Sequence, residues 1–150
     1  MRSLGLRGVN RGRRVFTTKS DPAGRRPTDL VQRRFFADAP LRRWVVDVTY
    51  VRAWQGFAYV AFVTDVFSRR IVGWNVASTL KVDILPLQAP DMAAFDAGGN
   101  LTGVTHHSDH GSNYMALVYI DRIAELGAIP STGTVSDSYD NATAEAIYAL

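Results

Sequence analysis

Apolar and polar positions alternate along residues 42–77 and predict three β-strands at the start of the folded region. The first, "RRWVVDVTYV" (42–51), is rich in Val, Thr and Tyr, which suit the pleated surface of a strand. Similar runs over 57–66 and 71–77 follow it, separated by short turns. Strands with such short connections pair in opposite directions, so we expect an antiparallel meander.

The second half of the chain alternates helical and strand patterns. The expected elements are a helix over 82–96, a strand over 101–107, a helix over 113–127, a strand over 128–131 and a helix from about Asp140 to Leu150. Pro90 falls inside the first helix, where a proline costs about 3 kcal/mol or introduces a kink. This order predicts an α/β fold, with a mixed five-stranded sheet and helices on both faces.

The first expected strand is apolar on both faces, which is typical of a central strand with layers on either side. Trp44 and Val46 share one face, whereas Asp47 lies on the other. A lone buried carboxylate is costly, so Asp47 requires a partner or a cation. We expect Trp44 and Trp74 in the core, and Trp54 near a hairpin tip.

Charge divides the chain into a basic arm and an acidic body. Residues 1–43 contain eleven Arg and one Lys against three Asp, whereas residues 44–150 contain four Arg and one Lys against nine Asp and two Glu. We expect residues 1–40 to be a poorly ordered arm or linker, and residues 41–150 to be the folded core. The arm is either a solvated tail or a phosphate-binding segment, because arginines gain from releasing counterions on a polyanion.

The chain contains no cysteine, which excludes disulfides and thiolate zinc sites and agrees with a cytoplasmic protein. No apolar run is long enough to predict a membrane span. All three histidines, His106, His107 and His110, lie in "VTHHSDHGSNY". Neighbouring strand residues point to opposite faces, so His106 and His107 do not readily reach one zinc ion.

Three acidic residues on separate elements form the strongest candidate site. Asp47 lies within the first strand, Asp109 follows the fourth strand, and Glu145 lies in the last helix. If strands one and four are neighbours, Asp47 and Asp109 meet, with Glu145 packed across from them. Carboxylates that close repel one another unless cations hold them, and oxygen ligands favour Mg²⁺ or Mn²⁺. Two such ions about 3.5–4 Å apart clamp the attacking and leaving oxygens in phosphodiester displacement.

Four ordered motifs resemble bacterial insertion-sequence transposases of the DDE class, whose catalytic core is like that of retroviral integrases. These motifs are "WVVDVTYV", "GFAYVAFVTDVFSRRIVGW", "HHSDHGSNY" and "DSYDNATAEAI". Between Asp109 and Glu145 lie 35 residues, the spacing for which this branch is named. The resemblance implies a ribonuclease-H-like fold in residues 41–150 and a catalytic, metal-binding triad of Asp47, Asp109 and Glu145.

The resemblance also implies two Mg²⁺ or Mn²⁺ ions, cleavage and strand transfer of DNA, and assembly of several copies on DNA ends. Residues expected to contact DNA are His110 and Asn113 near the triad, and Arg11, Arg13 and Arg14 in the arm. His107 is a further candidate donor near the metals, and Asp65 is expected to be structural.

Two alternatives to a transposase stay open: a ribonuclease-H-like nuclease without strand transfer, and an inactive remnant that only binds DNA. The chain stops five residues after Glu145, whereas the cores it resembles continue with further helices. We therefore expect an incomplete core with weak or no activity on its own.

Overall fold

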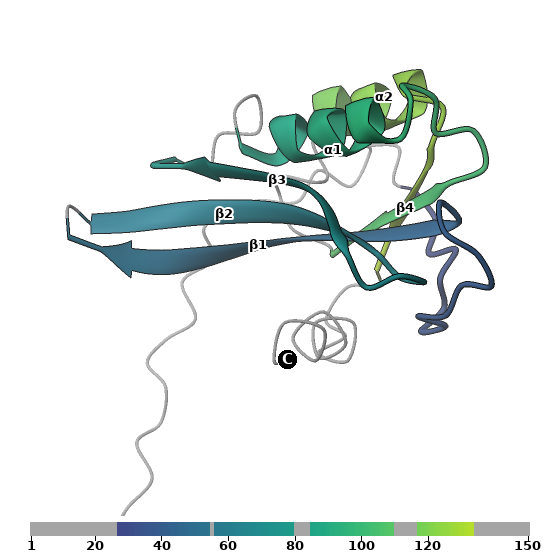
Figure 1. Ribbon diagram of the computed structural model, residues 1–150, viewed down its shortest axis with the longest axis horizontal. Coiled ribbons are helices and arrows are strands. Elements are labelled where there is room, and N and C mark those ends of the chain that lie inside the picture. The colour runs from purple at the N-terminus through teal and green to yellow at the C-terminus, as the bar shows by residue number, and fades with distance from the viewer. Residues whose placement is uncertain (1–26, 55, 80–84, 110–116, 134–150) are drawn as a thin grey trace, which may run out of the picture.

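The computed structural model describes residues 27–54, 56–79, 85–109 and 117–133, which form a five-stranded sheet and two helices (Figure 1). The strands are β1 (Arg43–Ala53), β2 (Gly56–Asp65), β3 (Ile71–Ala77), β4 (Thr105–Ser108) and β5 (Ile129–Thr132). Their order across the sheet is β3-β2-β1-β4-β5. The first three strands pair antiparallel, whereas β4 pairs parallel with both β1 and β5. This confirms the predicted meander and the predicted adjacency of the first and fourth strands.

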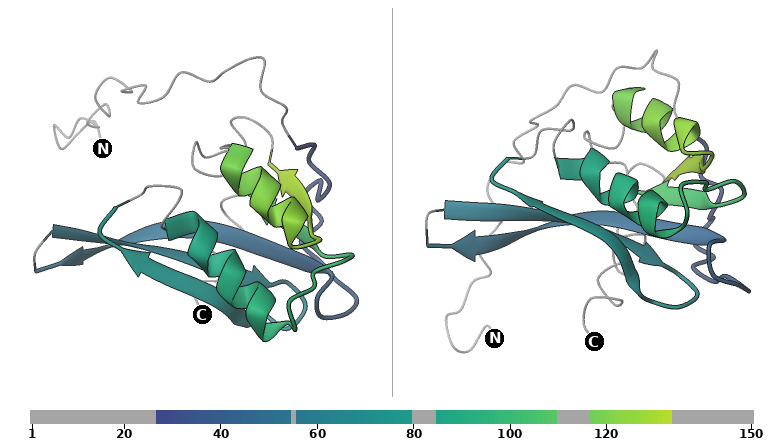
Figure 2. Two further views of the ribbon diagram at one scale, coloured as in Figure 1. Left: turned by 90° about the horizontal axis from the view of Figure 1, so that it is seen from above. Right: turned by 45° about the horizontal axis from the view of Figure 1, so that its top comes forward.

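Helices α1 (Leu85–Asp96) and α2 (Leu117–Glu125) lie side by side over the same face of the sheet (Figures 1 and 2). Helix α1 packs on β2 and β3, and α2 packs towards β5. The third predicted helix, from about Asp140, lies outside the described residues, so a helix on the opposite face stays a prediction. Neither described helix is long and apolar enough to cross a membrane.

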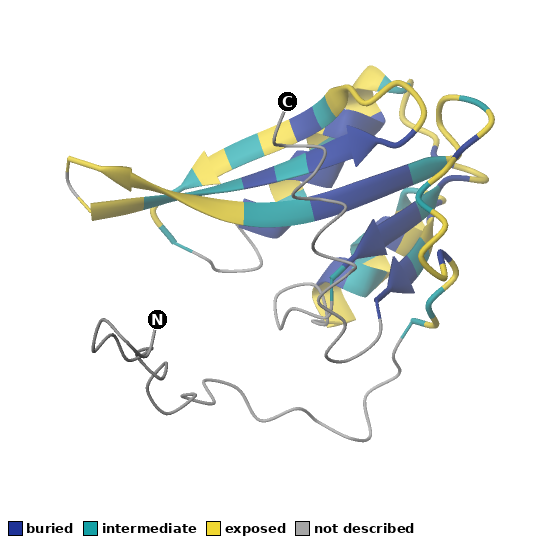
Figure 3. Ribbon diagram, turned by 90° about the horizontal axis from the view of Figure 1, so that it is seen from below, coloured by how far each residue is buried: buried dark blue, intermediate teal, exposed yellow. Residues whose placement is uncertain are grey.

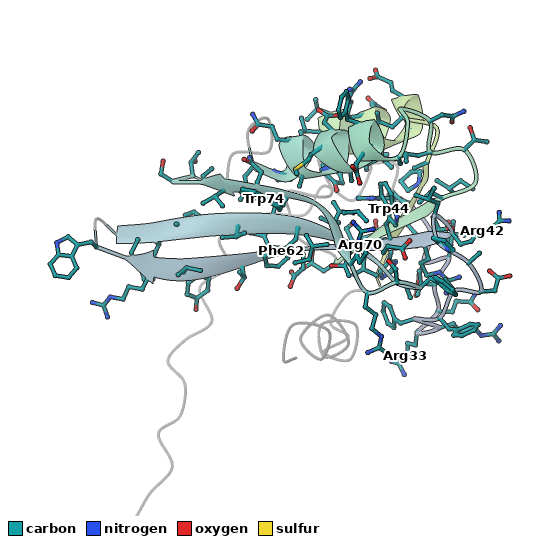
Figure 4. All side chains as sticks on the ribbon, in the orientation of Figure 1. Arg33, Arg42, Trp44, Phe62, Arg70 and Trp74 are labelled. Atoms are coloured by element: carbon teal, nitrogen blue, oxygen red, sulfur yellow. The ribbon has the colours of Figure 1, made fainter. Side chains whose placement is uncertain are left out.

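The main core lies between the sheet and these two helices. Trp44 is fully buried there, as predicted, and packs in one cluster with Val46, Val63, Leu85 and Ile123 (Figure 4). Because side chains alternate along a strand, every second residue of β1 and β2 contributes to this layer.

The prediction that Trp74 is buried is wrong, because its side chain is 53% exposed. Trp74 pairs with Phe62, which in turn pairs with Asp47, so all three belong to the face opposite the two helices. The apolar pattern of β3 predicts a strand, but it does not tell which face a helix covers.

Small residues let α1 approach the sheet closely. Gly73 of β3 lies against the backbone of α1, where an added Cβ would be 2.2 Å from the carbonyl oxygen of Ala89 and 2.8 Å from the Cβ of Ala93. Pro90 lies inside α1 as predicted and is buried, and the helix continues beyond it to Asp96. The many alanines of this helix therefore serve close packing.

Strands β1 and β2 differ from their predicted ranges by one or two residues at each end, and β4 and β5 begin later than predicted. Strand β4 begins at Thr105 and not at residue 101, because Leu101 to Val104 form a turn in which the Val104 N–H donates to the Leu101 carbonyl at 3.0 Å. Gly103 has a φ of 88° in this turn, a conformation that glycine adopts without strain. Strand β5 begins at Ile129, one residue later than predicted.

Residues 27–40 pack on the face opposite the helices, although their composition predicted a linker. Val31 is 1% exposed, and the Leu30 N–H donates to Ser131 Oγ at 2.9 Å. Ala37 joins a small apolar cluster with Val45. The packed structure therefore begins before the expected boundary near Leu41, while residues 1–26 lie outside the described part.

The paired ends of β1 and β2 form a long hairpin that extends beyond the helices (Figures 1 and 2). Exposed residues gather along this extension, whereas buried residues occupy the middle of the sheet (Figure 3). Trp54 lies between the two strands at the tip and is fully exposed, which confirms its predicted position.

Candidate active site

Two of the three predicted acidic residues lie at the same level of adjacent parallel strands. The pairing of β1 with β4 runs from Arg43 opposite Thr105 to Val46 opposite Ser108. The next residue along each chain is Asp47 and Asp109, respectively. Since neighbouring strands are about 4.8 Å apart, the two carboxylates leave the backbone close together. The structure therefore places these two residues near each other, while their predicted role stays a prediction.

Asp47 and Asp109 are both half-buried. Asp47 is in the central strand, and its Oδ1 accepts a hydrogen bond from the Val48 N–H at 2.8 Å. Asp109 follows the last residue of β4, beside the end of β5, where the Gly133 N–H donates to the Ser108 carbonyl at 3.0 Å. Both carboxylates are therefore attached to hydrogen-bonded backbone with little freedom to move.

Two half-buried carboxylates side by side suit a hard divalent cation. They repel each other when both are ionised, and a bound cation removes this cost. Oxygen donors without thiolates match the preference of Mg²⁺ and Mn²⁺. Within the described ranges, no group of three or more His, Cys, Asp or Glu side chains is close enough to hold a metal. The described part of the chain therefore contains two candidate ligands, and the third predicted one, Glu145, lies outside it.

The remaining predicted site residues lie outside the described ranges. They are Glu145, His110, Asn113, Arg11, Arg13 and Arg14. Their roles therefore stay predictions.

His106 and His107 point to opposite faces of β4, as predicted. His106 Nε2 is 2.7 Å from the hydroxyl of Tyr119 in α2, whereas His107 Nδ1 is 3.0 Å from Ser131 Oγ in β5. Both imidazoles are buried. His107 packs against the ring of Phe35 with the ring centroids 5.7 Å apart, and its predicted role as a donor near the metals stays a prediction. Each histidine contacts a different neighbour of β4.

The His106–Tyr119 pair joins β4 to α2 close to Asp109. Burial lowers the pKa of His106 from 6.5 to about 3, with a further contribution from His107. Burial also raises the pKa of Tyr119 well above its usual range, and the charge of Asp109 adds to this effect. His106 and Tyr119 are thus both neutral near pH 7, and Asp109 lies within electrostatic reach of the pair.

Protonation of His106 is expected to destabilise the protein in acid. In the unfolded chain this imidazole takes up a proton near pH 6.5, whereas in the folded chain it stays neutral to about pH 3. The unfolded state therefore binds more protons in this window, and the free energy of unfolding falls as the pH is lowered through it. One such group contributes up to about 1.4 kcal/mol per pH unit. Urea unfolding followed by circular dichroism between about pH 7 and pH 4 measures the slope.

His106→Asn is the matched variant for this experiment. The substitution removes the titrating group. The free energy of unfolding of His106→Asn should therefore change less steeply with pH than that of the unsubstituted chain, and the difference is the contribution of His106. Equal slopes for the two proteins would show that His106 does not carry this pH dependence.

Asp65 is structural, as predicted, and is 2% exposed at the end of β2. Its Oδ1 accepts hydrogen bonds from the N–H and the hydroxyl of Ser68, both at 2.8 Å, and its Oδ2 accepts one from the Leu41 N–H at 2.9 Å. The carboxylate therefore fixes the β2–β3 turn to the start of β1.

Two contacts near the site were not predicted from the sequence. The helical spacing of Tyr119 and Ile123 predicts that Tyr119 faces the core but gives no partner for its hydroxyl, and the sequence gives Ser131 no role. A buried tyrosine needs a hydrogen-bond partner, so the position of Tyr119 on a buried face was a usable signal. Ser131 offered no signal, because its partners His107 and Leu30 are distant in sequence.

Residues 37–138 match the family described as "Integrase core domain". The whole chain is also 51% identical to the "Putative transposase for insertion sequence element IS986/IS6110" of Mycobacterium tuberculosis strain CDC 1551, over 154 aligned residues. The alignment covers 100% of this chain and 55% of that protein, so the chain spans about half the length of the curated relatives it matches.

Two solved structures share the fold at low sequence identity. A chain of the simian T-cell lymphotropic virus intasome, solved with PP2A regulatory subunit B56 gamma, superposes with a TM-score of 0.64 at 14% identity, covering 87% of this chain and 44% of that one. The catalytic core domain of BIV integrase gives a TM-score of 0.50 at 18% identity, covering 72% and 64%. The predicted ribonuclease-H-like fold is thereby confirmed, and the chain belongs to the integrase core domain family.

Proposed function

We propose that this chain is the catalytic core of an insertion-sequence transposase, which cleaves DNA strands and joins them to new sites with Mg²⁺ or Mn²⁺. The observation that carries the proposal is the position of Asp47 and Asp109 at the same level of β1 and β4. Similarity over the whole of this chain, and over 55% of the length of a protein named as a transposase, supports the proposal.

Asp47, Asp109 and Glu145 would hold the metal, and two ions are expected. These residues fit Mg²⁺ or Mn²⁺, because Asp47 and Asp109 are half-buried carboxylates and the chain has no thiolate. Divalent ions in such a site lower the pKa of bound water and offset the charge of a phosphodiester. Glu145 is assigned on its spacing from Asp109 and on the family resemblance.

The remaining contribution of the protein is positioning. Asp47 lies in the central strand, and the Val48 N–H orients its carboxylate. Asp109 follows a strand that His106 fastens to α2 and that β5 supports on its other edge. Reacting groups must be held to within about 0.5 Å for efficient catalysis, and ligands on packed strands meet this need better than ligands on loops.

The proposed substrates are the ends of a DNA element and a target DNA, with several copies of the protein assembled on them. The protein would act in the cytoplasm of a bacterial cell, where its DNA lies. Candidate contacts to DNA are His110 and Asn113 beside the carboxylates and Arg11, Arg13 and Arg14 in the basic arm.

The test is to incubate the purified chain with labelled duplexes and to separate nicked from joined products. We expect small amounts of both products with Mg²⁺ or Mn²⁺, in keeping with the weak activity expected of the chain on its own, and neither product with EDTA. Nicks without joined strands would favour a ribonuclease-H-like nuclease. DNA binding without any product, in Mn²⁺ as well as Mg²⁺, would contradict the proposed activity and favour a remnant that only binds DNA.

A further inference from the structure

Exposed arginines gather at the end of the sheet where β1 begins, away from the hairpin tip. This arginine surface consists of Arg33, Arg34, Arg42, Arg69 and Arg70, together with the exposed rings of Phe36 and Phe67. Figure 4 shows Arg33, Arg42 and Arg70 towards this end of the molecule. The residues come from two segments, one that precedes β1 and one that connects β2 to β3.

Side-chain hydrogen bonds join these two segments to each other and to β1. The Asp65 carboxylate accepts hydrogen bonds from both Leu41 and Ser68, which joins the start of β1 to the β2–β3 turn. The Arg43 guanidinium donates to the Phe36 carbonyl at 2.8 Å and also to the Arg34 carbonyl. The exposed arginines thus project from a preorganised backbone, which reduces the entropy lost on binding a partner.

The surface is strongly basic and also carries exposed aromatic rings. Segments 33–43 and 65–70 contain six arginines and two aspartates, and Asp65 is one of these and is buried. Phe36 is 75% exposed and Phe67 is 50% exposed. Guanidinium groups bind phosphates in two-pronged geometry, so the partner that fits this composition is a phosphate polymer.

Arg43 connects the arginine surface to the strand that carries Asp47, because its guanidinium donates to the Arg34 carbonyl. Arg43 and Asp47 lie on the same face of β1, four residues apart, which corresponds to about 13 Å along a strand. Successive phosphates of one DNA strand rise about 3.4 Å along the helix axis, so this distance spans roughly four base pairs.

We propose that the arginine surface binds the phosphate backbone of duplex DNA a few base pairs away from the phosphate at Asp47. The choice of DNA as the polyanion rests on the proposed function. The surface does not include Arg11, Arg13 and Arg14 of the arm or the carboxylates proposed to bind metal. It would hold DNA without reading its sequence, because phosphate contacts position a protein on DNA whereas base contacts specify the sequence.

The test is DNA binding without metal, measured by fluorescence anisotropy with a duplex of about 30 base pairs in EDTA at several salt concentrations. Arg42→Gln is the test variant and Arg52→Gln is its matched control. Both arginines are exposed, but Arg42 lies immediately before β1 and Arg52 lies near the opposite end of that strand. Each phosphate contact contributes about 0.9 to the slope of log K against log salt. We expect the slope to become shallower by about 0.9 in Arg42→Gln and by about 1.8 in Arg69→Gln/Arg70→Gln, with no change in Arg52→Gln.

Equal slopes for all of these variants would overturn the proposal. Variants that bind DNA normally but lose self-association would also overturn it, since the surface would then be a protein interface. Circular dichroism melting establishes that each variant is folded, and Arg33→Gln/Arg34→Gln replaces any variant that is not. Because no metal is present, the binding measurement does not depend on the proposed catalysis, so failure of the catalysis and failure of this surface are distinguishable.

Discussion

Asp109→Asn is expected to reduce metal-dependent cleavage and joining of DNA by more than about 100-fold. Asparagine keeps the shape of the side chain but removes the charge that binds the cation. Loss of even an outer hydrogen-bond partner of a metal ligand typically costs about 10–100-fold, so loss of a ligand should cost more. Asp47→Asn should have an equally large effect, because the two residues occupy the same level of β1 and β4. Timed assays of nicked and joined products measure both rates.

Asp121→Asn provides the matched control, since Asp121 is an exposed residue of α2. Its activity should be unchanged. A second measurement separates loss of metal binding from loss of folding. A saturating ligand at 100 times its dissociation constant stabilises a protein by about 2.7 kcal/mol, so Mg²⁺ should raise the melting temperature of the unsubstituted chain and not that of Asp109→Asn. Activity of Asp109→Asn within about twofold of normal would contradict the metal assignment.

Gly73→Ala is expected to destabilise the fold by about 3 kcal/mol or more, at the upper end of the range for overpacked cores. The new Cβ would lie 2.2 Å from the Ala89 carbonyl oxygen and 2.8 Å from the backbone nitrogen and the Cβ of Ala93. All three atoms belong to or adjoin the α1 backbone, so the helix must move away from β3. For a chain of this size the melting temperature should fall by roughly 6–12 °C. Thermal unfolding followed by circular dichroism measures the shift.

Gly98→Ala is the comparison for this experiment. An added Cβ at Gly98 meets nothing within 4 Å, but its φ of 88° disfavours alanine. The expected cost is therefore the backbone strain alone, about 1–2 kcal/mol. If Gly73→Ala were no less stable than Gly98→Ala, α1 would not be held against β3 as closely as the structure has it.

Local pattern was sufficient to predict the strands of the meander and the two faces of β1. Alternation placed Trp44 in the core and Asp47 on the opposite face, since side-chain direction depends on the extended backbone itself. The same reasoning separated His106 from His107, as their different partners confirm. It failed for Trp74, because the exposure of a strand face depends on what packs over it.

Local sequence pattern does not predict contacts between segments that are distant in the chain. The composition of residues 27–40 predicted a linker, yet Leu30 donates to Ser131, 101 residues away. The boundary of β4 was misplaced for a different reason. The apolar residues Leu101 and Val104 suggest a strand, but they belong to a turn, and both side chains are buried in the core.

The order of strands and helices, the family resemblance and the identity of Asp47 and Asp109 as candidate site residues follow from the sequence alone, because they depend on periodicity and on residue types at given spacings. The shared level of the two carboxylates, the contact between Tyr119 and His106, and the joining of the two segments that carry the exposed arginines depend on the tertiary structure. Proximity of this kind arises when the sheet closes and buries its apolar face, and no single segment encodes it.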